Sequence, residues 1–378
     1  MIHVARRLLQ NLRSDRNRPP LERLASIEEP ERFTWEVLPY AARTFSFCIA
    51  LLPRRTARPL AVAYLYCRML DTCEDLPRAV AEKEAALRAM VDRFDGAAAP
   101  RPAPRLAADG LARDDGLARD ERDRVYLLLL RHAERVDRCF LTLPAAQREG
   151  IVRLVRRMGE GMIWAVRTFA EQGGALDGRA QLTRYCFEVL GNPLLFAEEM
   201  QRLEMGLPPE VDARRKELVA AVGEAIQLAN VARDLEKDSA AGVYYDPTLR
   251  TGARAPLPAA IAAVRGHLLG RAIVLGRAFR PYMEGVPTPR ISLARGAGLA
   301  LLLFTLAFWQ GTARRLGLAL FENSSHVTPL RATVWIVRAV FSRRGADGVL
   351  ARIEGAFSHA EAALAKTRSD GEGRAWSH

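Results

Sequence analysis

No stretch of this sequence alternates apolar and polar residues as a half-buried β-strand would, and clusters of β-branched residues are few. Apolar residues instead recur at helical spacing between residues 33 and 366. With 378 residues, 49% of them hydrophobic, the chain is long enough to bury a large core, as one large domain or two smaller ones. We therefore predict an all-α fold.

Composition divides the chain into a body and two polar ends. Residues 1–30 are polar, rich in arginine and interrupted by a proline pair, so we expect a poorly packed lead-in. The all-α domain is expected to cover residues 31–366. Inside it, residues 95–120 contain DGLARD twice in tandem and are rich in Ala, Pro, Gly and Asp, which predicts a surface loop. Residues 367–378 are expected to form a polar tail.

An acidic motif ends the first strongly apolar helix. Residues 60–66 are apolar, and Asp71, Glu74 and Asp75 follow at offsets that place all three carboxylates on one helix face. At an effective dielectric constant near 20, two like charges 5 Å apart repel by roughly 3 kcal/mol. Either water bathes this face or a cation sits on it, and the apolar run favours the cation because it indicates a largely buried helix. Mg²⁺ takes such oxygen ligands, completed by substrate phosphates.

A second acidic cluster ends another long apolar helix. Asp234 and Asp238 share a face there, with Gln227, Asn230 and Arg233 within reach of the same end. Two such helices facing each other across a cavity would form a cage for Mg²⁺ ions and a diphosphate, with arginines balancing the charge. Each cluster alone is weak evidence, whereas the pair is much stronger.

The chain is strongly basic. Its formal net charge is +12, and the excess is nearly all arginine, a residue that binds phosphate bidentately. Nucleic acid, an anionic membrane surface or a phosphorylated substrate would each fit this charge. No recognition motif or aromatic–basic platform accompanies it, so we expect no nucleic-acid partner.

No secretory signal is visible, and the longest apolar run is short. Residues 296–309 would rise about 21 Å as a helix, less than the roughly 30 Å of the hydrocarbon layer. We therefore expect a cytoplasmic protein without a signal peptide or transmembrane helix, able to lie peripherally at the inner face of a membrane. The five cysteines form no CxxC pair and are expected to be reduced thiols. The histidines lack metal-ligand spacing and receive no role.

Six segments occur in an order that points to one family. They are RTFS at 43–46, YLYCRMLDTCED at 64–75, MGEGM at 158–162, YCFEVLG at 185–191, NVARDLEKD at 230–238 and GVYYDP at 242–247. Together they resemble the motifs of the squalene/phytoene synthase family, the head-to-head prenyltransferases, over roughly residues 33–309. The second and fifth segments resemble the two aspartate-rich motifs of that family, the first in the spelling typical of squalene synthases.

Three positions depart from the family pattern. Lys237 stands where a carboxylate usually precedes the last aspartate, a two-unit change of charge that could remove one metal ion or supply a direct contact to diphosphate. Glu236, one residue earlier, is expected on a different face and so is a poor substitute. Val243 replaces an arginine of the turn, and Asn192-Pro193 is a spelling similar to the hydroxysqualene-synthase branch.

The resemblance implies a single-domain class I isoprenoid synthase (terpene synthase) helical fold around a central cavity. It implies a Mg²⁺-dependent condensation of two molecules of farnesyl diphosphate, or another prenyl diphosphate, through presqualene diphosphate to squalene with NADPH as the reductant. Nothing local in the sequence indicates an NADPH site, because residues 159–161 have GxG spacing but follow no predicted strand.

The resemblance also implies roles for the residues of these motifs. The implied metal ligands are Asp71, Glu74, Asp75, Asp234 and Asp238, and the implied diphosphate-binding residues are Arg43, Arg68 and Arg233. Each arginine has the alternative of an ordinary surface or ion-paired position.

The remaining candidates are aromatic or amide side chains. Tyr185 is expected to steer the first half-reaction through its hydroxyl, and Tyr64 to support it or merely to satisfy a backbone carbonyl. Gln227 and Asn230 would orient water, diphosphate or the cofactor amide, or else make a helix-packing hydrogen bond. Phe304 and Phe308 would line the pocket for the prenyl chains, where aromatic faces stabilise a carbocation by about 1–2 kcal/mol, or serve core packing. 

Several functions compete with squalene synthesis. Three related activities are alternatives. The enzyme would stop at presqualene diphosphate, release hydroxysqualene after capture of water, or condense C20 substrates to phytoene. A different alternative is a non-catalytic, membrane-associated family member, which Lys237 and Val243 favour and the intact acidic triad opposes.

Overall fold

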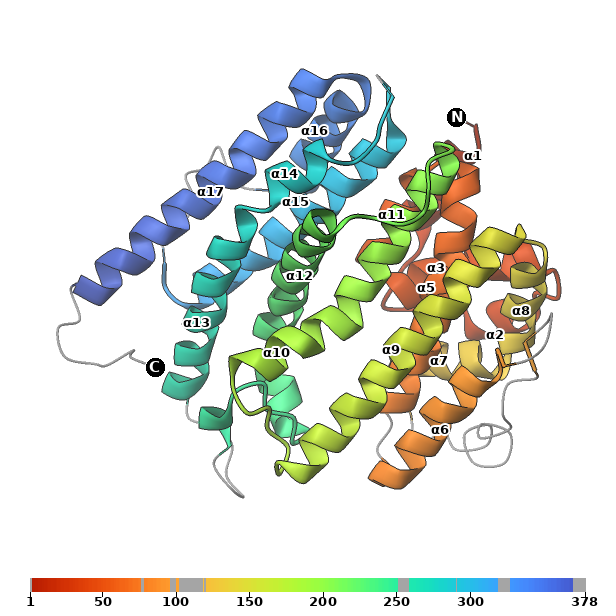
Figure 1. The fold of residues 1–378 in the computed structure, drawn as a ribbon, viewed down its shortest axis with the longest axis horizontal. Coiled ribbons are helices and arrows are strands. Elements are labelled where there is room, and N and C mark those ends of the chain that lie inside the picture. The colour runs from red at the N-terminus through yellow and green to blue at the C-terminus, as the bar shows by residue number, and fades with distance from the viewer. Residues whose placement is uncertain are drawn as a thin grey trace. The chain divides into compact units, whose positions relative to one another are not determined.

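The computed structural model describes residues 2–75, 78–95, 100–101, 118, 120–250, 258–289, 291–318 and 327–369. These residues form helices and no strand, apart from one isolated parallel bridge between Ala175 and Tyr244 (Figure 1). The all-α prediction is confirmed. The predicted loop at 95–120 and the predicted tail at 367–378 lie largely outside the described residues.

The helices gather into two compact units, residues 1–171 with 192–211 and residues 172–191 with 212–378. Unit 1 contains α1 (Ile2–Arg13), α2 (Leu21–Ala25), α3 (Pro30–Ala42), α4 (Thr44–Leu51), α5 (Arg54–Asp75), α6 (Val80–Asp92), α7 (Glu121–Arg131), α8 (Ala133–Leu141), α9 (Ala145–Glu171) and α11 (Asn192–Glu204). Unit 2 contains α10 (Arg179–Cys186), the π-helix η2 (Phe187–Gly191), α12 (Ala213–Ala240), the 3₁₀ helix η3 (Pro247–Leu249), α13 (Pro258–Gly276), α14 (Phe279–Glu284), α15 (Leu293–Arg315), α16 (Pro329–Phe341) and α17 (Arg343–Ser369).

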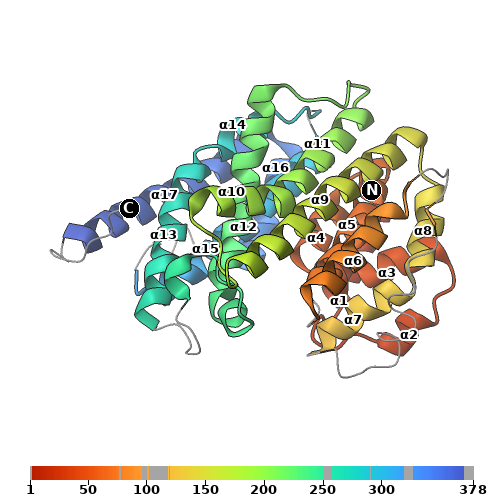
Figure 2. The same cartoon turned by 60° about the horizontal axis from the view of Figure 1, so that its bottom comes forward.

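Helix α5 is the centre of unit 1. It packs against α3, α6, α9 and α11 (Figure 2). Its apolar side chains Leu65 and Met69 are fully buried. Helix α9 lies against α6, where a Cβ atom at Gly159 would be only 2.3 Å from the side chain of Val91. Gly159 of the MGEGM segment therefore serves close packing of α9 on α6, and the GxG spacing of residues 159–161 lies within a helix.

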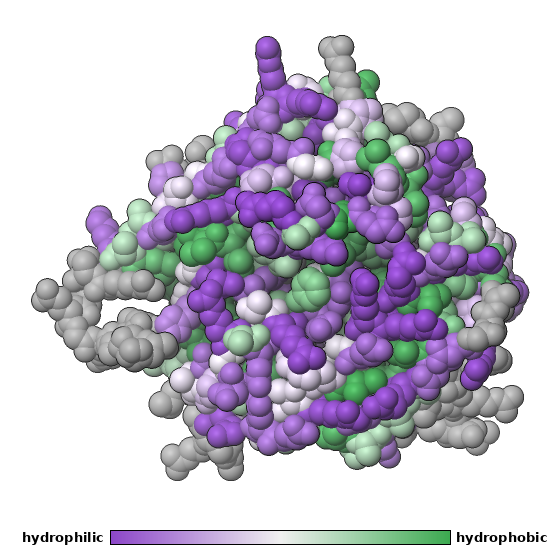
Figure 3. Space-filling view, in the orientation of Figure 1, coloured by the Kyte–Doolittle hydropathy of each residue, from purple (hydrophilic) through white to green (hydrophobic). Residues whose placement is uncertain are grey.

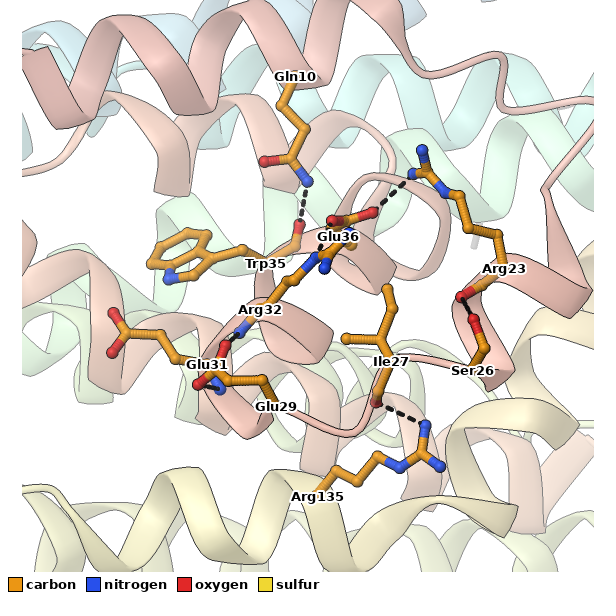
Figure 4. A network of polar contacts seen from close by, with 10 residues as sticks. All are labelled: Gln10, Arg23, Ser26, Ile27, Glu29, Glu31, Arg32, Trp35, Glu36 and Arg135. Carbon is orange, nitrogen blue, oxygen red and sulfur yellow. Dashed lines mark hydrogen bonds and ion pairs between the residues drawn. The ribbon is translucent and has the colours of Figure 1, made fainter.

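The N-terminal residues pack more tightly than the poorly packed lead-in that their composition predicts. Leu24 is fully buried, the Gln10 side chain donates to the Trp35 carbonyl at 2.9 Å, and Arg135 donates to the Ile27 carbonyl at 2.7 Å (Figure 4). The arginine content is misleading because a buried arginine, Arg7, lies over the Trp35 ring and is a packing residue.

Unit 2 is built around α12. This helix packs against η2, α13 and α15, and the fully buried Trp309 of α15 donates its indole N–H to the Ala225 carbonyl at 3.3 Å. A Cβ atom at Gly223 would lie 3.1 Å from the Gly191 backbone, so α12 and η2 approach each other through two glycines. Helices α16 and α17 pack on α15 and on each other.

Two helices of unit 2, α13 and α15, are long and apolar enough to cross a membrane by length and composition. Of their most apolar windows, 50% and 61% are buried in the structure, and core helices of globular proteins pass the same test. The helical rise calculated from residues 296–309 underestimates the length of α15, because this helix has 23 residues and continues through polar residues to Arg315.

Candidate functional site

The first acidic motif lies at the end of α5, where one arginine connects three predicted residues. Arg68 donates to the Tyr64 hydroxyl at 3.1 Å and forms an ion pair with Asp71 at 3.1 Å. The spacing of four and three residues places all three side chains on one helix face. Tyr64, Arg68 and Asp71 are therefore brought together, whereas the side chain of Asp75 is exposed beyond them.

The carboxylates of this motif are destabilised as charged groups. Burial raises the pKa of Asp71 to about 6, although the charge of Arg68 opposes the shift and that of Asp75 adds to it. Burial raises the pKa of Glu74 well above its usual range, and the charges of Asp75 and Asp71 raise it further. Lys83 of α6 partly opposes this effect. Such a set of repelling carboxylates is stabilised by a cation.

The donor set fits Mg²⁺ if phosphate completes the coordination. Within the described parts of the chain, no three His, Cys, Asp or Glu side chains are arranged to hold a metal ion by themselves. Mg²⁺ requires only one or two protein carboxylates, because it keeps water and binds substrate phosphates. Asp71 has a second oxygen besides the one that is paired with Arg68, and Glu74 has an unfavourable charge to neutralise.

Aromatic rings hold the side chain of Arg68 in place. Its guanidinium lies 4.7 Å from the ring centroid of Tyr126 in α7 and 5.9 Å from that of Tyr64. The Tyr64 ring in turn packs against Phe45 of α4 at 5.6 Å. Sequence reasoning missed Tyr126 because α7 carries no motif, while Phe45 lies within the RTFS segment and was available as a signal.

Arg43 occupies a strained backbone position between α3 and α4. Its φ of 48° with ψ of −109° is the single positive φ of a non-glycine residue among those described. Such strain persists only where the surroundings enforce it, and it is concentrated at functional sites. The Ser46 hydroxyl donates to the Arg43 carbonyl at 2.5 Å and so holds the turn of the RTFS segment.

Arg16, from the predicted lead-in, is a second basic residue near Arg43. Burial lowers the pKa of Arg16, and the positive charge of Arg43 lowers it further. Its Nε atom is buried without a hydrogen-bond partner in the described chain. An anion would relieve both conditions, which adds Arg16 to the candidate diphosphate-binding residues.

The second acidic motif, on α12, is organised around Arg233. Its guanidinium donates twice to Asp234, at 2.9 and 2.5 Å, and this hydrogen bonding raises the pKa of Arg233. The same guanidinium lies 5.0 Å from the ring centroid of Phe308 in α15. Asp238, one turn further on, also adds a negative charge near Arg233. Arg233, Asp234 and Phe308 thus form one cluster.

The positions that depart from the family pattern have different environments. Glu236 accepts two hydrogen bonds from Arg265 of α13, at 2.7 and 2.6 Å, so the prediction that it lies on another face is confirmed. Lys237 is exposed. The main chain of Val243 donates to the Asp238 carbonyl at 2.9 Å, which ties the GVYYDP turn to the end of α12.

The amide pair and the predicted catalytic tyrosine lie in unit 2. Asn230 donates to the Gln227 side chain at 3.2 Å, a hydrogen bond between successive turns of α12. Tyr185 is buried and packs against Tyr245, with ring centroids 5.5 Å apart. Tyr245 belongs to the GVYYDP segment, so this turn contributes an aromatic neighbour that the sequence motif alone did not identify.

A π-helix begins two residues after Tyr185. Single turns of π-helix inside α-helices are frequent at functional sites, and η2 covers residues 187–191 of the YCFEVLG segment. Gly191 ends it against Gly223, as described above. The two glycines allow η2 to lie close to α12, and so fix the distance between α12 and the neighbouring segment that carries Tyr185.

Phe304 and Phe308 are both half-buried and lie one turn apart on α15. Phe308 contacts Arg233, a role the sequence did not predict. Their predicted role as a lining for prenyl chains remains a prediction.

Comparisons with known proteins agree with these features. The family model of squalene/phytoene synthases matches residues 38–316. The squalene synthase BSS of Botryococcus braunii is 27% identical over 212 residues, which are 56% of this chain and 41% of that protein. The chain thus spans less than half the length of this relative.

Solved structures support the same fold. Complexes of TcSQS with the ligands BPH1237 and E5700 each superpose with a TM-score of 0.64 at 17% identity, over 90% of this chain and 99% of TcSQS. At this identity the similarity establishes the helical fold.

Proposed function

Because the chain belongs to the squalene/phytoene synthase family of head-to-head prenyltransferases, we propose that it condenses two molecules of farnesyl diphosphate through presqualene diphosphate to squalene. Members of this family are transferases of isoprenoid biosynthesis that bind prenyl diphosphates. The observation that carries the proposal is the α5 face, where Asp71 and Glu74 have raised pKa values beside Arg68.

The first step removes diphosphate from one substrate and leaves an allylic cation. Bound Mg²⁺, with Asp71, Glu74, Asp75, Asp234 and Asp238 as proposed ligands, would neutralise the negative charge of the leaving group. Arg43, Arg68 and Arg233 would bind the phosphate oxygens, with Arg16 as the addition from the fold. Arg68 is suited to this role because the rings of Tyr64 and Tyr126 hold it before substrate arrives.

The second step joins the cation to the double bond of the other substrate with loss of a proton. We propose that the Tyr185 hydroxyl steers this step, since it lies on the segment next to η2 and is shielded from bulk water. Phe304 and Phe308 would offer aromatic faces to the cation. Gln227 and Asn230 would orient the departing diphosphate or a water molecule.

The reduction to squalene requires NADPH, and here the chain offers less support. The GxG spacing at residues 159–161 lies inside α9, so it provides no glycine-rich turn for a dinucleotide. We therefore assign no residue to the hydride transfer. Whether the hydride transfer occurs is tested by the product that forms in the presence of NADPH.

The decisive experiment incubates the purified chain with farnesyl diphosphate and Mg²⁺, with and without NADPH, and identifies products by mass spectrometry. Squalene that appears only with NADPH supports the proposal. Presqualene diphosphate as the final product in both reactions would show that the chain catalyses only the first half-reaction. Hydroxysqualene as the product would show that water, and not hydride, captures the second cation. No turnover of farnesyl diphosphate would contradict the proposal.

Hydroxysqualene synthesis is the second candidate, because Asn192-Pro193 is the spelling similar to that branch. Asn192 is buried at the junction of η2 and α11. A hydroxylated C30 product formed without NADPH is the result that would favour this candidate.

Replacing Lys237 by Glu is expected to increase the affinity for Mg²⁺. The positive charge of lysine next to Asp238 repels the cation, whereas a carboxylate at this position attracts it. We expect the Mg²⁺ concentration that gives half-maximal diphosphate release to fall about three- to tenfold in Lys237→Glu. Lys216→Glu is the matched control, since Lys216 is an exposed lysine on the first turns of the same helix. An unchanged Mg²⁺ dependence in Lys237→Glu would show that this side chain points away from the metal.

A further inference from the structure

Helix α16 carries a stripe of exposed hydrophobic side chains. Leu330, Val334, Val337 and Phe341 are 76%, 48%, 49% and 52% exposed. At about 100° per residue, their spacing of four, three and four places them within roughly 60° of one another on one face of the helix. Figure 3 shows several hydrophobic patches among hydrophilic side chains on one face of the molecule. Single exposed apolar residues are common on soluble proteins, whereas a stripe of them along one helix face indicates an interaction surface.

The opposite face of α16 holds the helix firmly on unit 2. Ala332, Ile336, Ala339 and Val340 are buried, and α16 packs on α15 and α17. A Cβ atom at Gly296 would be only 2.4 Å from the Val340 side chain, so α15 and α16 approach closely. The stripe is therefore presented on a fixed helix rather than on a mobile segment.

Ile291 extends the apolar surface beyond the end of the helix. Its side chain is 58% exposed, and the neighbouring Ser292 donates its main-chain N–H to the Val340 carbonyl at 2.9 Å. This hydrogen bond places Ile291 beside the C-terminal turn of α16, which Phe341 ends.

Exposed arginines lie along one side of the stripe. Arg331 and Arg338 lie together about 80–100° from Leu330 around the helix. Arg343 and Arg344 follow at the exposed start of α17, and α16 itself contains no Asp or Glu. A helix with one apolar face and a basic border is the pattern of helices that lie in the interface of an anionic bilayer.

We propose that α16 docks this protein on an anionic membrane surface, with Leu330, Val334, Val337, Phe341 and Ile291 inserted among the lipids. Arg331 and Arg338 border the inserted face and pair with lipid phosphates. This inference stands apart from the reaction proposed above, because it rests on exposure and charge alone.

A second copy of the chain fits this surface less well. Contact through a two-fold axis at α16 would bring the same arginines of both copies close together. The surface offers five apolar side chains, whereas a standard protein interface uses roughly 20–30 residues on each side. Anionic lipid complements both the apolar stripe and its positive border.

The test is sedimentation with vesicles of phosphatidylcholine alone and of 70% phosphatidylcholine with 30% phosphatidylserine, proportions chosen so that the mixed vesicles carry a clear negative charge. The chain is expected to bind the mixed vesicles at least tenfold more tightly, since each arginine near an anionic surface contributes about fivefold. Leu330→Ser with Phe341→Ser should reduce binding to both vesicles, and Arg331→Gln with Arg338→Gln should reduce binding to the anionic vesicles selectively.

Val274→Ser is the matched control, since Val274 is a half-exposed valine on α13 of the same unit. Circular dichroism melting should show that all variants remain folded. Absence of vesicle binding by the unmodified chain, or unchanged binding by the Leu330→Ser/Phe341→Ser variant, would overturn the proposal. A dimer in solution that this variant dissociates, without vesicle binding, would overturn it in favour of pairing between copies.

Discussion

Replacing Asp71 by Asn is expected to slow diphosphate release from farnesyl diphosphate by about 10²–10³-fold, the loss typical of removing one stabiliser of a developing negative charge. The same substitution is expected to stabilise the metal-free protein at pH 8. Both effects follow from one property of the α5 face. A carboxylate that is held in a partly buried, repulsive position is unfavourable until a cation binds it.

The direction of the stability change follows from proton binding. The pKa of Asp71 rises from its usual 3.8 to about 6 in the folded chain, so the folded state binds this proton more tightly than the unfolded state. Stability from this group is complete below about pH 4 and is lost as the pH rises to about 6. Above about pH 6, the raised pKa of Asp71 lowers the free energy of unfolding by about 3 kcal/mol. This is an upper limit for the gain in stability in Asp71→Asn, because the ion pair with Arg68 is lost as well.

Thermal melts in EDTA at pH 5 and pH 8 test this prediction. Asp71→Asn should melt higher than the unmodified chain at pH 8, and the difference should shrink at pH 5. Asp92→Asn, at an exposed aspartate at the end of α6, should leave both rate and melting temperature nearly unchanged. Loss of stability at pH 8 in Asp71→Asn would mean that Asp71 is a structural partner of Arg68 rather than a ligand.

Replacing Gly223 by Val is expected to destabilise the protein by about 3 kcal/mol. Already the Cβ atom would lie 3.1 Å from the backbone of Gly191, and backbone atoms cannot move aside as a flexible side chain does. The substitution should displace η2 and with it the segment that carries Tyr185, so we also expect a loss of turnover that exceeds the loss of folded protein.

Gly270→Ala is the matched control, because no atom lies within 4 Å of a Cβ at this helical position of α13. It should stabilise the chain by about 0.5–1 kcal/mol through helix propensity. Urea denaturation of both variants, followed by circular dichroism, measures the two changes. Equal stability of Gly223→Val and the unmodified chain would contradict the close approach of α12 and η2.

The sequence predicted the fold class and the α5 face because both depend on local spacing. Asp71 and Arg68 are three residues apart, so helical geometry alone brings them together. The second motif was predicted equally well in position, but the pairing of Arg233 with its neighbour Asp234 and with Phe308 was not. Contact with Phe308 depends on how α15 packs on α12, which no local pattern encodes.

The residues that sequence reasoning missed come from segments without a motif. Arg16 was assigned to a poorly packed lead-in, whereas Arg7 and Leu24 show that buried side chains fix this segment to unit 1. Tyr126 was missed because α7 contains only ordinary apolar periodicity. The exposed apolar stripe that includes Val334 was not predicted either, because helical spacing alone does not show which face of a helix is buried.

The central claim is that this chain removes diphosphate from a prenyl substrate with Mg²⁺ held by its acidic motifs. The most direct measurement follows the release of inorganic diphosphate from farnesyl diphosphate while Mg²⁺ is titrated into the metal-free protein. We expect release that requires Mg²⁺, saturates with it and is nearly abolished in Asp71→Asn. Release that persists in EDTA, or that Asp71→Asn leaves unchanged, would contradict it.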